Sequence, residues 1–280
     1  MRSMTMRKQF AVGLAAVLTL TAAACGSDDE SSDAEDTGGD STTEIKTLAD
    51  LTGNKIGVQS NTTGATYAEE NKPEGAEVVS FPDTSAASAA LLSGQIDAIL
   101  QDLPVNAGLA AENPGFTVVE TYKTDEQYGF AVAKGSPLKE ELNGALETVR
   151  NNGIYDAIFD KYFPTGGAEA GPGPEESDVV GTESITVCSD IPYPPMEMEG
   201  DGPRGLSYTG FDIDLMDALA AELGKNLEVR AVPWDGILGN LASGSCDVVA
   251  SSVTITEERE AEVDFVGPYF DADQSLLVKG

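Results

Sequence analysis

The sequence has no histidine, and its three cysteines, Cys25, Cys188 and Cys246, lie far apart in a chain of 280 residues. Triads with a histidine base, imidazole metal sites and clustered-thiolate zinc sites are therefore excluded, and we expect neither a metal nor a cofactor. Basic residues are also few: 16 Lys+Arg against 48 Asp+Glu give a net charge of −32, which excludes a nucleic-acid partner held through its phosphates. Hydrophobic residues make up 41% of the chain, enough to bury a core in one large or two ordinary domains.

Residues 1–25 have the pattern of a secretion signal. Basic residues precede an apolar run, AVGLAAVLTLTAAAC, that is shorter than the roughly 20 residues needed to cross a bilayer. The small residues before Cys25 resemble a bacterial lipobox, in which the cysteine becomes the lipid-modified first residue of the mature protein. The alternative is an ordinary signal peptide cut near an Ala-x-Ala pattern. Met4 and Met6 are alternative starts, because either keeps basic residues before the apolar run.

Two segments lack the apolar residues that a packed core needs. Residues 26–43 are acidic and contain no apolar residue larger than alanine, so they cannot offset their ordering entropy and are predicted to form a flexible tether. Residues 164–184 are rich in Pro, Gly and Glu, which predicts a linker. Beyond the N-terminal run, we expect no segment to cross a membrane.

A repeated pattern lies on either side of this linker. LLSGQIDAILQD begins at Leu91 and LASGSCDVVASS at Leu241, an offset of 150 residues, and each reads as a helix end, a glycine C-cap and a buried strand. A weaker match aligns KIGVQS, from Lys55, with SITVCS, from Ser184. The matches predict two α/β units of similar connectivity, although short echoes of this kind also arise by chance.

Helical periodicity separates the predicted strands. SPLKEELNGALETVR has Ser136 as its expected N-cap, IYDAIFDKYF repeats the spacing, and DIDLMDALAAELG has Asp212 or Asp214 as its N-cap and Gly224 as its end. Helices that alternate with strands favour largely parallel, helix-flanked sheets, which is an α/β fold. In such sheets ligands bind beyond the carboxyl ends of the strands, so residues just past each strand are candidate site residues.

One of these stretches, SSVTITEER, suits an anion. Ser252, Thr254 and Arg259 lie near a helix start, where free backbone amides and a bidentate guanidinium can bind a negative group. The alternative is a capping box from Thr254 to Glu257, with Arg259 on the surface.

Three further stretches follow predicted strands or precede helices at the same edge. Each has a structural interpretation when taken alone, as a helix cap, a turn or a core aromatic. A helix is expected to start at Asp235, directly after the only tryptophan. Convergence at one sheet edge is what favours a binding site. The candidates are Thr62, Thr63, Asp102, Asp190, Tyr193 and Trp234.

The motifs resemble a known family. CSDIPYPPM, GFDIDLMDALAAELG, VPWDGIL, CDVVASSVTITEERE and VDFVGPYFDADQSLLVKG are similar to the first half of a family 3 extracellular solute-binding protein of an amino-acid ABC transporter. TLADLTGNKIGVQSNTTG, SGQIDAILQD and YGFAVAKGSPLKEELNGALETVRNNGIYDAIFDKYF are similar to its second half. Together they cover nearly everything from Glu44 to Gly280 except the linker. The halves stand in the opposite order to that of the family, so the chain resembles a circular permutant.

The resemblance implies an α/β, two-lobed, periplasmic-binding-protein-like fold (type II) that is circularly permuted. The signal peptide and the tether would precede two discontinuous lobes, and the linker would join the usual family termini. SLLVK would insert inside the sheet of lobe 2. The implied boundaries are 1–25 for the lipoprotein signal, 26–43 for the tether, 44–126 plus 275–280 for lobe 2, 127–131 and 271–274 for the hinge, 132–163 plus 185–270 for lobe 1, and 164–184 for the linker.

The resemblance also assigns roles at a ligand site. Arg259 would hold the α-carboxylate of an amino acid, helped by the amides of Thr254 and Thr63. Asp102 and Ser252 would take the α-ammonium group. The site set also includes Thr62, Asp190, Tyr193 and Trp234.

The ligand side chain would meet Tyr193, Trp234 and Asp190. Asp190 matches the position that meets a cationic side chain in the lysine/arginine/ornithine binders of the family. With neutral Gln59 and Gln101 nearby, it favours a basic or polar amino acid over glutamate.

The resemblance further implies a monomer without catalytic residues that passes a free amino acid to an ABC transporter permease. It would be exported and anchored through lipid at Cys25 to the outer face of the cytoplasmic membrane. Two alternatives stay open. One is a sensory amino-acid-binding module that signals to a receptor, and the other is an enzyme similar to cyclohexadienyl dehydratase, which needs a catalytic acid in the cleft.

An exported protein could form a disulfide between Cys188 and Cys246. If Asp190 and Ser252 both lie at the cleft edge, however, the cysteines are staggered by about four residues, about 13 Å along neighbouring strands. Bridged cysteines rarely have Cα atoms more than about 7 Å apart, so we expect no disulfide.

Overall fold

The computed structural model describes residues 44–164, 171, 173 and 181–280. The predicted signal and tether, including Cys25, and most of the predicted linker lie outside the described residues. Within the described ranges, no helix combines the length and the apolar character that a bilayer crossing requires.

A single eight-stranded sheet forms the frame of the fold, with strands in the order β2-β1-β3-β10-β4-β9-β5-β8. Its strands are β1 (Lys55–Gln59), β2 (Glu77–Phe81), β3 (Ala98–Asp102), β4 (Phe116–Ala133), β5 (Ser184–Ser189), β8 (Asn226–Ala231), β9 (Val248–Val249) and β10 (Val263–Lys279). A separate two-stranded sheet pairs β6 (Met198–Glu199) with β7 (Tyr208–Thr209).

Parallel pairing is confined to the two ends of the large sheet. The strands β2, β1 and β3 are parallel and lie in the segment predicted as lobe 2, and the strands β9, β5 and β8 are parallel and lie in the segments predicted as lobe 1; we keep these two names below. Between them lie two long antiparallel strands, so the largely parallel sheet expected from the sequence is interrupted in its middle. The fold is a two-lobed α/β fold of the periplasmic-binding-protein type.

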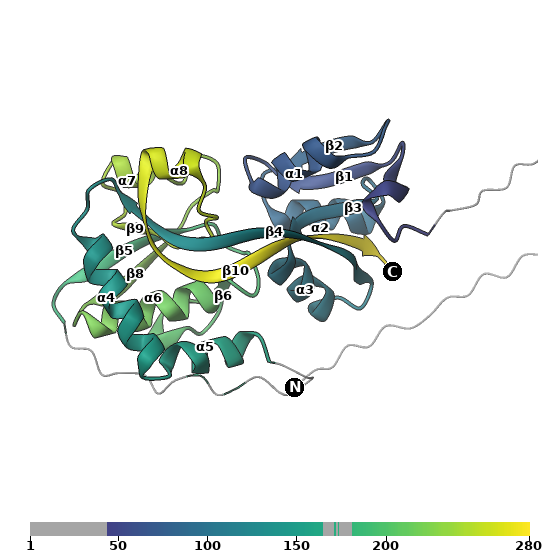
Figure 1. Cartoon of the computed structure of the whole chain (residues 1–280). Coiled ribbons are helices and arrows are strands. Elements are labelled where there is room, and N and C mark those ends of the chain that lie inside the picture. Colours follow the sequence, from purple (N-terminus) through teal and green to yellow (C-terminus); the bar gives the residue numbers. More distant parts are fainter. Residues whose placement is uncertain (1–43, 165–170, 172, 174–180) are drawn as a thin grey trace, which may run out of the picture. The chain divides into compact units, whose positions relative to one another are not determined.

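The long strands β4 and β10 run side by side from one lobe to the other (Figure 1). Their pairing shifts register between Val266 and Phe270 and between Ala272 and Gln274. Beyond the second shift, residues 274–278 of β10 pair with β3 on one side, while β4 lies on the other. The end of β10 is therefore an interior strand of lobe 2.

Helices flank the sheet in both lobes. They are α1 (Thr63–Asn71), α2 (Thr84–Ser93), α3 (Leu103–Glu112), α4 (Leu138–Asn151), α5 (Ile154–Tyr162), α6 (Phe211–Glu222), α7 (Gly239–Ala242) and α8 (Glu257–Glu262), with 3-10 turns at Leu48–Leu51 and Pro203–Gly205. The N-cap of α4 is Pro137, one residue after the expected Ser136. The helix buries Leu142, Ala145, Leu146 and Val149 on one face.

The start of α6 differs from the sequence prediction. Neither Asp212 nor Asp214 is the N-cap; the cap is Gly210, and both aspartates lie inside the helix. Gly210 has φ 121°, and a Cβ there would lie 2.2 Å from the carbonyl oxygen of Met196. The backbone passes too close for any other residue, so a glycine begins the helix and Asp212 is carried into the interior.

The 150-residue repeat is confirmed at atomic detail. Gly94 is the C-cap of α2 and Gly244 directly follows the C-cap of α7, and both have positive φ, at 73° and 70°. The side chain of Asp97 accepts a hydrogen bond from the Lys55 backbone N–H at 2.8 Å, and Asp247 does the same with Thr186 at 2.8 Å. Each aspartate thereby fixes the register of two neighbouring parallel strands.

The weaker repeat match, of KIGVQS with SITVCS, was wrong in its alignment by two residues. The sequence alignment paired Lys55 with Ser184, whereas the aspartate contacts make Lys55 equivalent to Thr186. Sheet register agrees, because Ile56 pairs with Ala98 as Val187 pairs with Val248. The corrected offset places equivalent strand ends, and the loops after them, at the same sheet edge.

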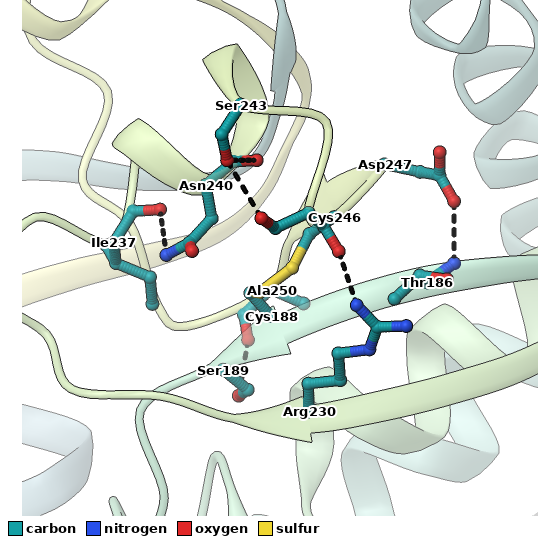
Figure 2. The surroundings of a disulfide bond; sticks show 11 residues. Thr186, Cys188, Ser189, Arg230, Ile237, Asn240, Ser243, Cys246, Asp247 and Ala250 are labelled. Atoms are coloured by element: carbon teal, nitrogen blue, oxygen red, sulfur yellow. Dashed lines mark hydrogen bonds between the residues drawn. A yellow bond between two sulfur atoms is a disulfide. The ribbon is translucent and has the colours of Figure 1, made fainter.

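Cys188 and Cys246 form a disulfide, so the expectation of free thiols was wrong (Figure 2). Their Cα atoms are 5.8 Å apart. Cys246 precedes β9 instead of lying in it, so a distance measured along paired strands does not apply. The carbonyl of Ser245 accepts a hydrogen bond from Arg230, the partner of Cys188 in β8, and this holds the turn beside Cys188.

Removing this bridge should destabilise the protein. The bridge closes a 58-residue separation, so a double Cys188→Ser, Cys246→Ser variant should lose about 2–4 kcal/mol of unfolding free energy in guanidinium titrations. A Cys25→Ser variant serves as the control and should not change. Titratable thiols from Cys188 and Cys246 in the unfolded, unreduced protein would contradict the bridge.

Candidate functional site

The ends of the parallel strands of both lobes meet around one cavity, which has an empty volume of about 320 Å³. All nine residues predicted for a ligand site line it, and their ligand-binding roles remain predictions. The full lining is Gln59, Thr62, Thr63, Asp102, Asp190, Tyr193, Trp234, Ser251, Ser252, Thr254 and Arg259.

Lobe 2 contributes the end of β3 and the start of α1. Asp102 is the last residue of β3, and Thr62 caps α1 by accepting a hydrogen bond from Ala65 N–H at 3.0 Å. Gly64 lets this turn pack closely, because a Cβ there would lie 2.9 Å from Oε1 of Gln274. The close packing brings Thr63 to the cavity.

Lobe 1 contributes the loop after β9 and the helix α8. The N-cap of α8 is Thr256, whose hydroxyl accepts a hydrogen bond from Arg259 N–H at 3.2 Å. The alternative of a capping box from Thr254 to Glu257 is therefore wrong. Thr254 is left to line the cavity, and one helical turn places the Arg259 side chain beside it.

The Arg259 guanidinium has spare hydrogen-bonding capacity. Nη1 donates to the carbonyl of Thr254 at 2.8 Å, and Cζ lies 5.3 Å from the centre of the Trp234 ring. Arginine has five N–H donors, and among the described residues this side chain donates only that one hydrogen bond. Burial lowers its pKa, the charges of Asp102 and Glu126 raise it, and the group stays protonated. It can therefore bind an anion in the cavity.

Asp102 is the matching buried carboxylate. Its Oδ1 accepts from Nε2 of Gln274 at 2.6 Å, and its Oδ2 accepts from the hydroxyls of Tyr128 and Tyr193. Burial, together with the charge of Glu126, raises its pKa to about 6 despite these hydrogen bonds. Among the described residues Asp102 has no hydrogen-bonded cationic partner, and a cation in the cavity would supply one.

Hydrogen bonds join the two lobes at the rim of the cavity. Nε2 of Gln59 donates to Asp190 at 2.7 Å. Nδ2 of Asn61 donates to Asp235 at 2.8 Å, and the indole N–H of Trp234 donates to the Asn61 carbonyl at 3.2 Å. The lobes are thus in contact around the cavity. A molecule bound in it would contact both lobes.

Ser252 lies on a pair of buried acids. Its φ is 49°, its N–H donates to Asp212 at 2.8 Å, and its hydroxyl donates to Glu197 at 3.0 Å. Burial raises the pKa of both acids, that of Asp212 to about 6 and that of Glu197 well above its usual range. One proton shared by the pair allows both to stay buried, and the two hydrogen bonds hold Ser252 in its unusual backbone conformation.

The chemistry of this cavity is ion pairing and hydrogen bonding. Within the described ranges, no group of three or more His, Cys, Asp or Glu side chains is arranged to hold a metal ion. Separately, residues 185–280 match the family of bacterial extracellular solute-binding proteins, family 3. The matched segment, residues 185–280, belongs to this family.

Relatives within the family are binding proteins for amino acids. The probable histidine-binding protein of Neisseria gonorrhoeae is 38% identical over 93 residues, 33% of this chain and 33% of that protein. The ABC transporter glutamine-binding protein GlnH of Bacillus subtilis (strain 168) is 36% identical over 128 residues, 45% of this chain and 46% of that protein. The chain thus spans a third to just under half of the length of these two curated relatives.

A solved structure shows the same likeness over one domain. The arginine-bound form of domain 1 from TmArgBP is 32% identical to this chain and covers 34% of it and 79% of that domain, with a TM-score of 0.29.

Some residues that hydrogen-bond the cavity lining carried no clear signal in the sequence. Glu126 and Gln274 lie on the long strands that join the lobes, and nothing in their local pattern marks them. Asp212 looked like a helix cap, and only its apolar surroundings in DIDLMDALAAELG hinted at burial. Gln101 was expected near the ligand, but it hydrogen-bonds Thr84 and Asn106 and does not line the cavity. Neighbours in a strand face opposite sides, so Gln101 points away where Asp102 points in.

The helix expected at Asp235 begins at Gly239. The residues between form turns, and Asp235 instead accepts hydrogen bonds from Ser60 and Asn61 across the cleft. Asp235 is therefore a contact between the lobes.

Proposed function

We propose that this protein captures a free amino acid, basic or polar, between its lobes outside the cytoplasmic membrane and delivers it to an ABC transporter permease. One observation carries the proposal: Arg259 from lobe 1 and Asp102 from lobe 2 line the same cavity. A free amino acid presents a carboxylate and an ammonium group on one carbon, which complements this pair of charges. The family and the names of its members support an amino acid as the ligand.

The ligand carboxylate would bind Arg259. The unused N–H groups of the Arg259 guanidinium can form a bidentate pair with a carboxylate. The N–H of Thr63, in the first turn of α1, has no partner within its helix, and the N–H of Thr254 lies at the other side of the cavity. The ammonium group belongs with Asp102, with Ser252 beside it.

The remaining lining favours a basic or polar side chain. Burial raises the pKa of Asp190, whose carboxylate accepts a hydrogen bond from Gln59 at the cavity rim. A cationic or polar group beside Asp190 would offset the cost of burying its charge. Tyr193, Trp234 and Thr62 provide the walls.

Binding should favour the closed arrangement of the lobes. The carboxylate and ammonium partners lie on different lobes, so an amino acid makes both contacts only when the lobes meet. A permease can then recognise the closed form.

Export, anchoring and the order of the halves complete the proposal. A disulfide between Cys188 and Cys246 suits an oxidising compartment outside the cytoplasm. We propose lipid anchoring at Cys25, a monomeric state and a circularly permuted order of the lobes. The family match to residues 185–280, which correspond to the first half of the motif order, supports the permutation.

A thermal-shift screen over the common amino acids tests the function. A ligand present at a thousand times its dissociation constant should raise the melting temperature by on the order of 10 °C. We expect L-arginine, L-lysine or a polar amino acid to act, and glutamate to have no effect. Agmatine, which lacks the carboxylate of arginine, is the control and should give no shift. A screen in which no amino acid raises the melting temperature would contradict the proposal.

A further inference from the structure

Glu126 lies on β4 where the strand passes between the lobes, and it does not line the ligand cavity. Its Oε2 accepts a hydrogen bond from the hydroxyl of Thr63 at 2.6 Å and from the hydroxyl of Thr254 at 3.1 Å. Its Oε1 accepts from Nε2 of Gln274 at 3.1 Å. One carboxylate therefore joins a threonine of lobe 2 to a threonine of lobe 1.

Proton counting fixes the direction of these bonds. An ionised carboxylate only accepts hydrogen bonds, and a threonine hydroxyl has one proton and two lone pairs. The direct Thr63–Thr254 hydroxyl contact is 3.5 Å, longer than either contact to Glu126, so both protons go to the carboxylate. Both threonines also line the cavity, and the hydroxyls can offer it only lone pairs.

The Glu126 side chain is half-buried and reaches away from the ligand cavity on one side. It lines a second cavity of about 1260 Å³ that shares no lining residue with the ligand cavity. Glu126 therefore acts on the ligand cavity only through the residues that it contacts.

We infer that Glu126 is a positioning residue that orients the Thr63 and Thr254 hydroxyls as acceptors for the ligand ammonium group, next to Asp102. The inference rests on the proposed function. The two charged groups of the ligand would then have separate partners. The hydroxyls and Asp102 bind the ammonium group, and Arg259 and the backbone N–H groups bind the carboxylate. A Gln side chain at 126 has one acceptor oxygen and one donor nitrogen, so it cannot accept from all three donors.

Isothermal titration with L-arginine tests the inference. Glu126→Gln should weaken binding about tenfold to a hundredfold, because hydrogen bonds that involve a charged group are lost or reversed. The matched control is Glu120→Gln, another glutamate on β4, whose carboxylate accepts from Leu48 N–H and the Tyr122 hydroxyl in lobe 2. Its affinity should equal that of the parent protein.

A double-mutant cycle separates orientation from a general structural effect. If Glu126 acts through the hydroxyls, Glu126→Gln should have an effect at least about threefold smaller in a Thr63→Val or a Thr254→Val background. Equal effects of Glu126→Gln in all backgrounds, or no effect in the parent, would overturn the inference. L-arginine binding by the parent would still uphold the proposed function. A parent protein that binds neither L-arginine nor L-glutamine would contradict both the inference and the proposed function. Melting temperatures of the unliganded variants show whether each one is folded.

Discussion

Replacing Arg259 by alanine should abolish amino-acid binding and leave the protein folded. The guanidinium is the cationic group that lines the cavity, and a bidentate pair with a carboxylate contributes two charge-assisted hydrogen bonds. Each is worth about 1.5–3 kcal/mol, so the loss should be at least about a hundredfold in the dissociation constant. Titration calorimetry with L-arginine and L-glutamine measures it.

Two companion variants sharpen this result. Arg230→Ala removes a guanidinium that also donates to a backbone carbonyl, that of Ser245 at 2.8 Å, but lies outside the cavity. It should bind as the parent does. Arg259→Lys keeps the charge without the planar fork and should fall between the parent and the alanine variant. An unchanged affinity of the Arg259→Ala variant would show that the ligand carboxylate lies elsewhere.

Replacing Asp102 by asparagine should weaken binding at least about a hundredfold while making the unliganded protein more stable. The folded pKa of about 6 lies above the value of 3.8 for an ordinary aspartate. The native state therefore holds this proton more tightly than the unfolded chain does, and stability falls as pH rises through the window from about 4 to about 6. At pH 7 asparagine avoids that cost, and its amide nitrogen can donate to a tyrosine hydroxyl in place of accepting from it, so the free energy of unfolding should rise by up to about 2–3 kcal/mol. Denaturant titrations at pH 7 measure it, and a loss of stability would contradict the account.

The same carboxylate makes ligand binding depend on pH. An ammonium group beside Asp102 favours its ionised form, so below pH of about 6 binding must release a proton and the dissociation constant should rise about tenfold per pH unit. Asp212 has a similar pKa but lies behind Ser252, so Asp212→Asn should keep this slope. An affinity that is constant from pH 8 to pH 5 would contradict the assignment of the ammonium site to Asp102.

The sequence predicts the position of the cavity well because strand ends are local features. Asp102 and Ser252 occupy equivalent positions of a repeat whose glycines and aspartates are themselves visible in the sequence. Parallel strands carry such residues to one edge whatever the details of packing.

The parts that the sequence missed depend on contacts between distant segments. The role of Glu126 requires that β4 pass between two threonines separated by 191 residues, Thr63 and Thr254. The disulfide requires a turn that leaves the strand direction before β9, which no strand count can show. Asp212 is interior because the backbone at Gly210 approaches Met196, again a tertiary contact.

The interior place of residues 274–278 also sets a condition on biosynthesis. Gln274 pairs with Asp102, a residue synthesised 172 positions earlier. Until that late segment arrives, β3 and β4 present unpaired edges, which invite pairing with other chains. A nascent polypeptide therefore cannot complete the sheet of lobe 2 until residues 274–278 have been synthesised. Such a chain suits export in which the unfolded polypeptide passes through a translocation channel and folds afterwards.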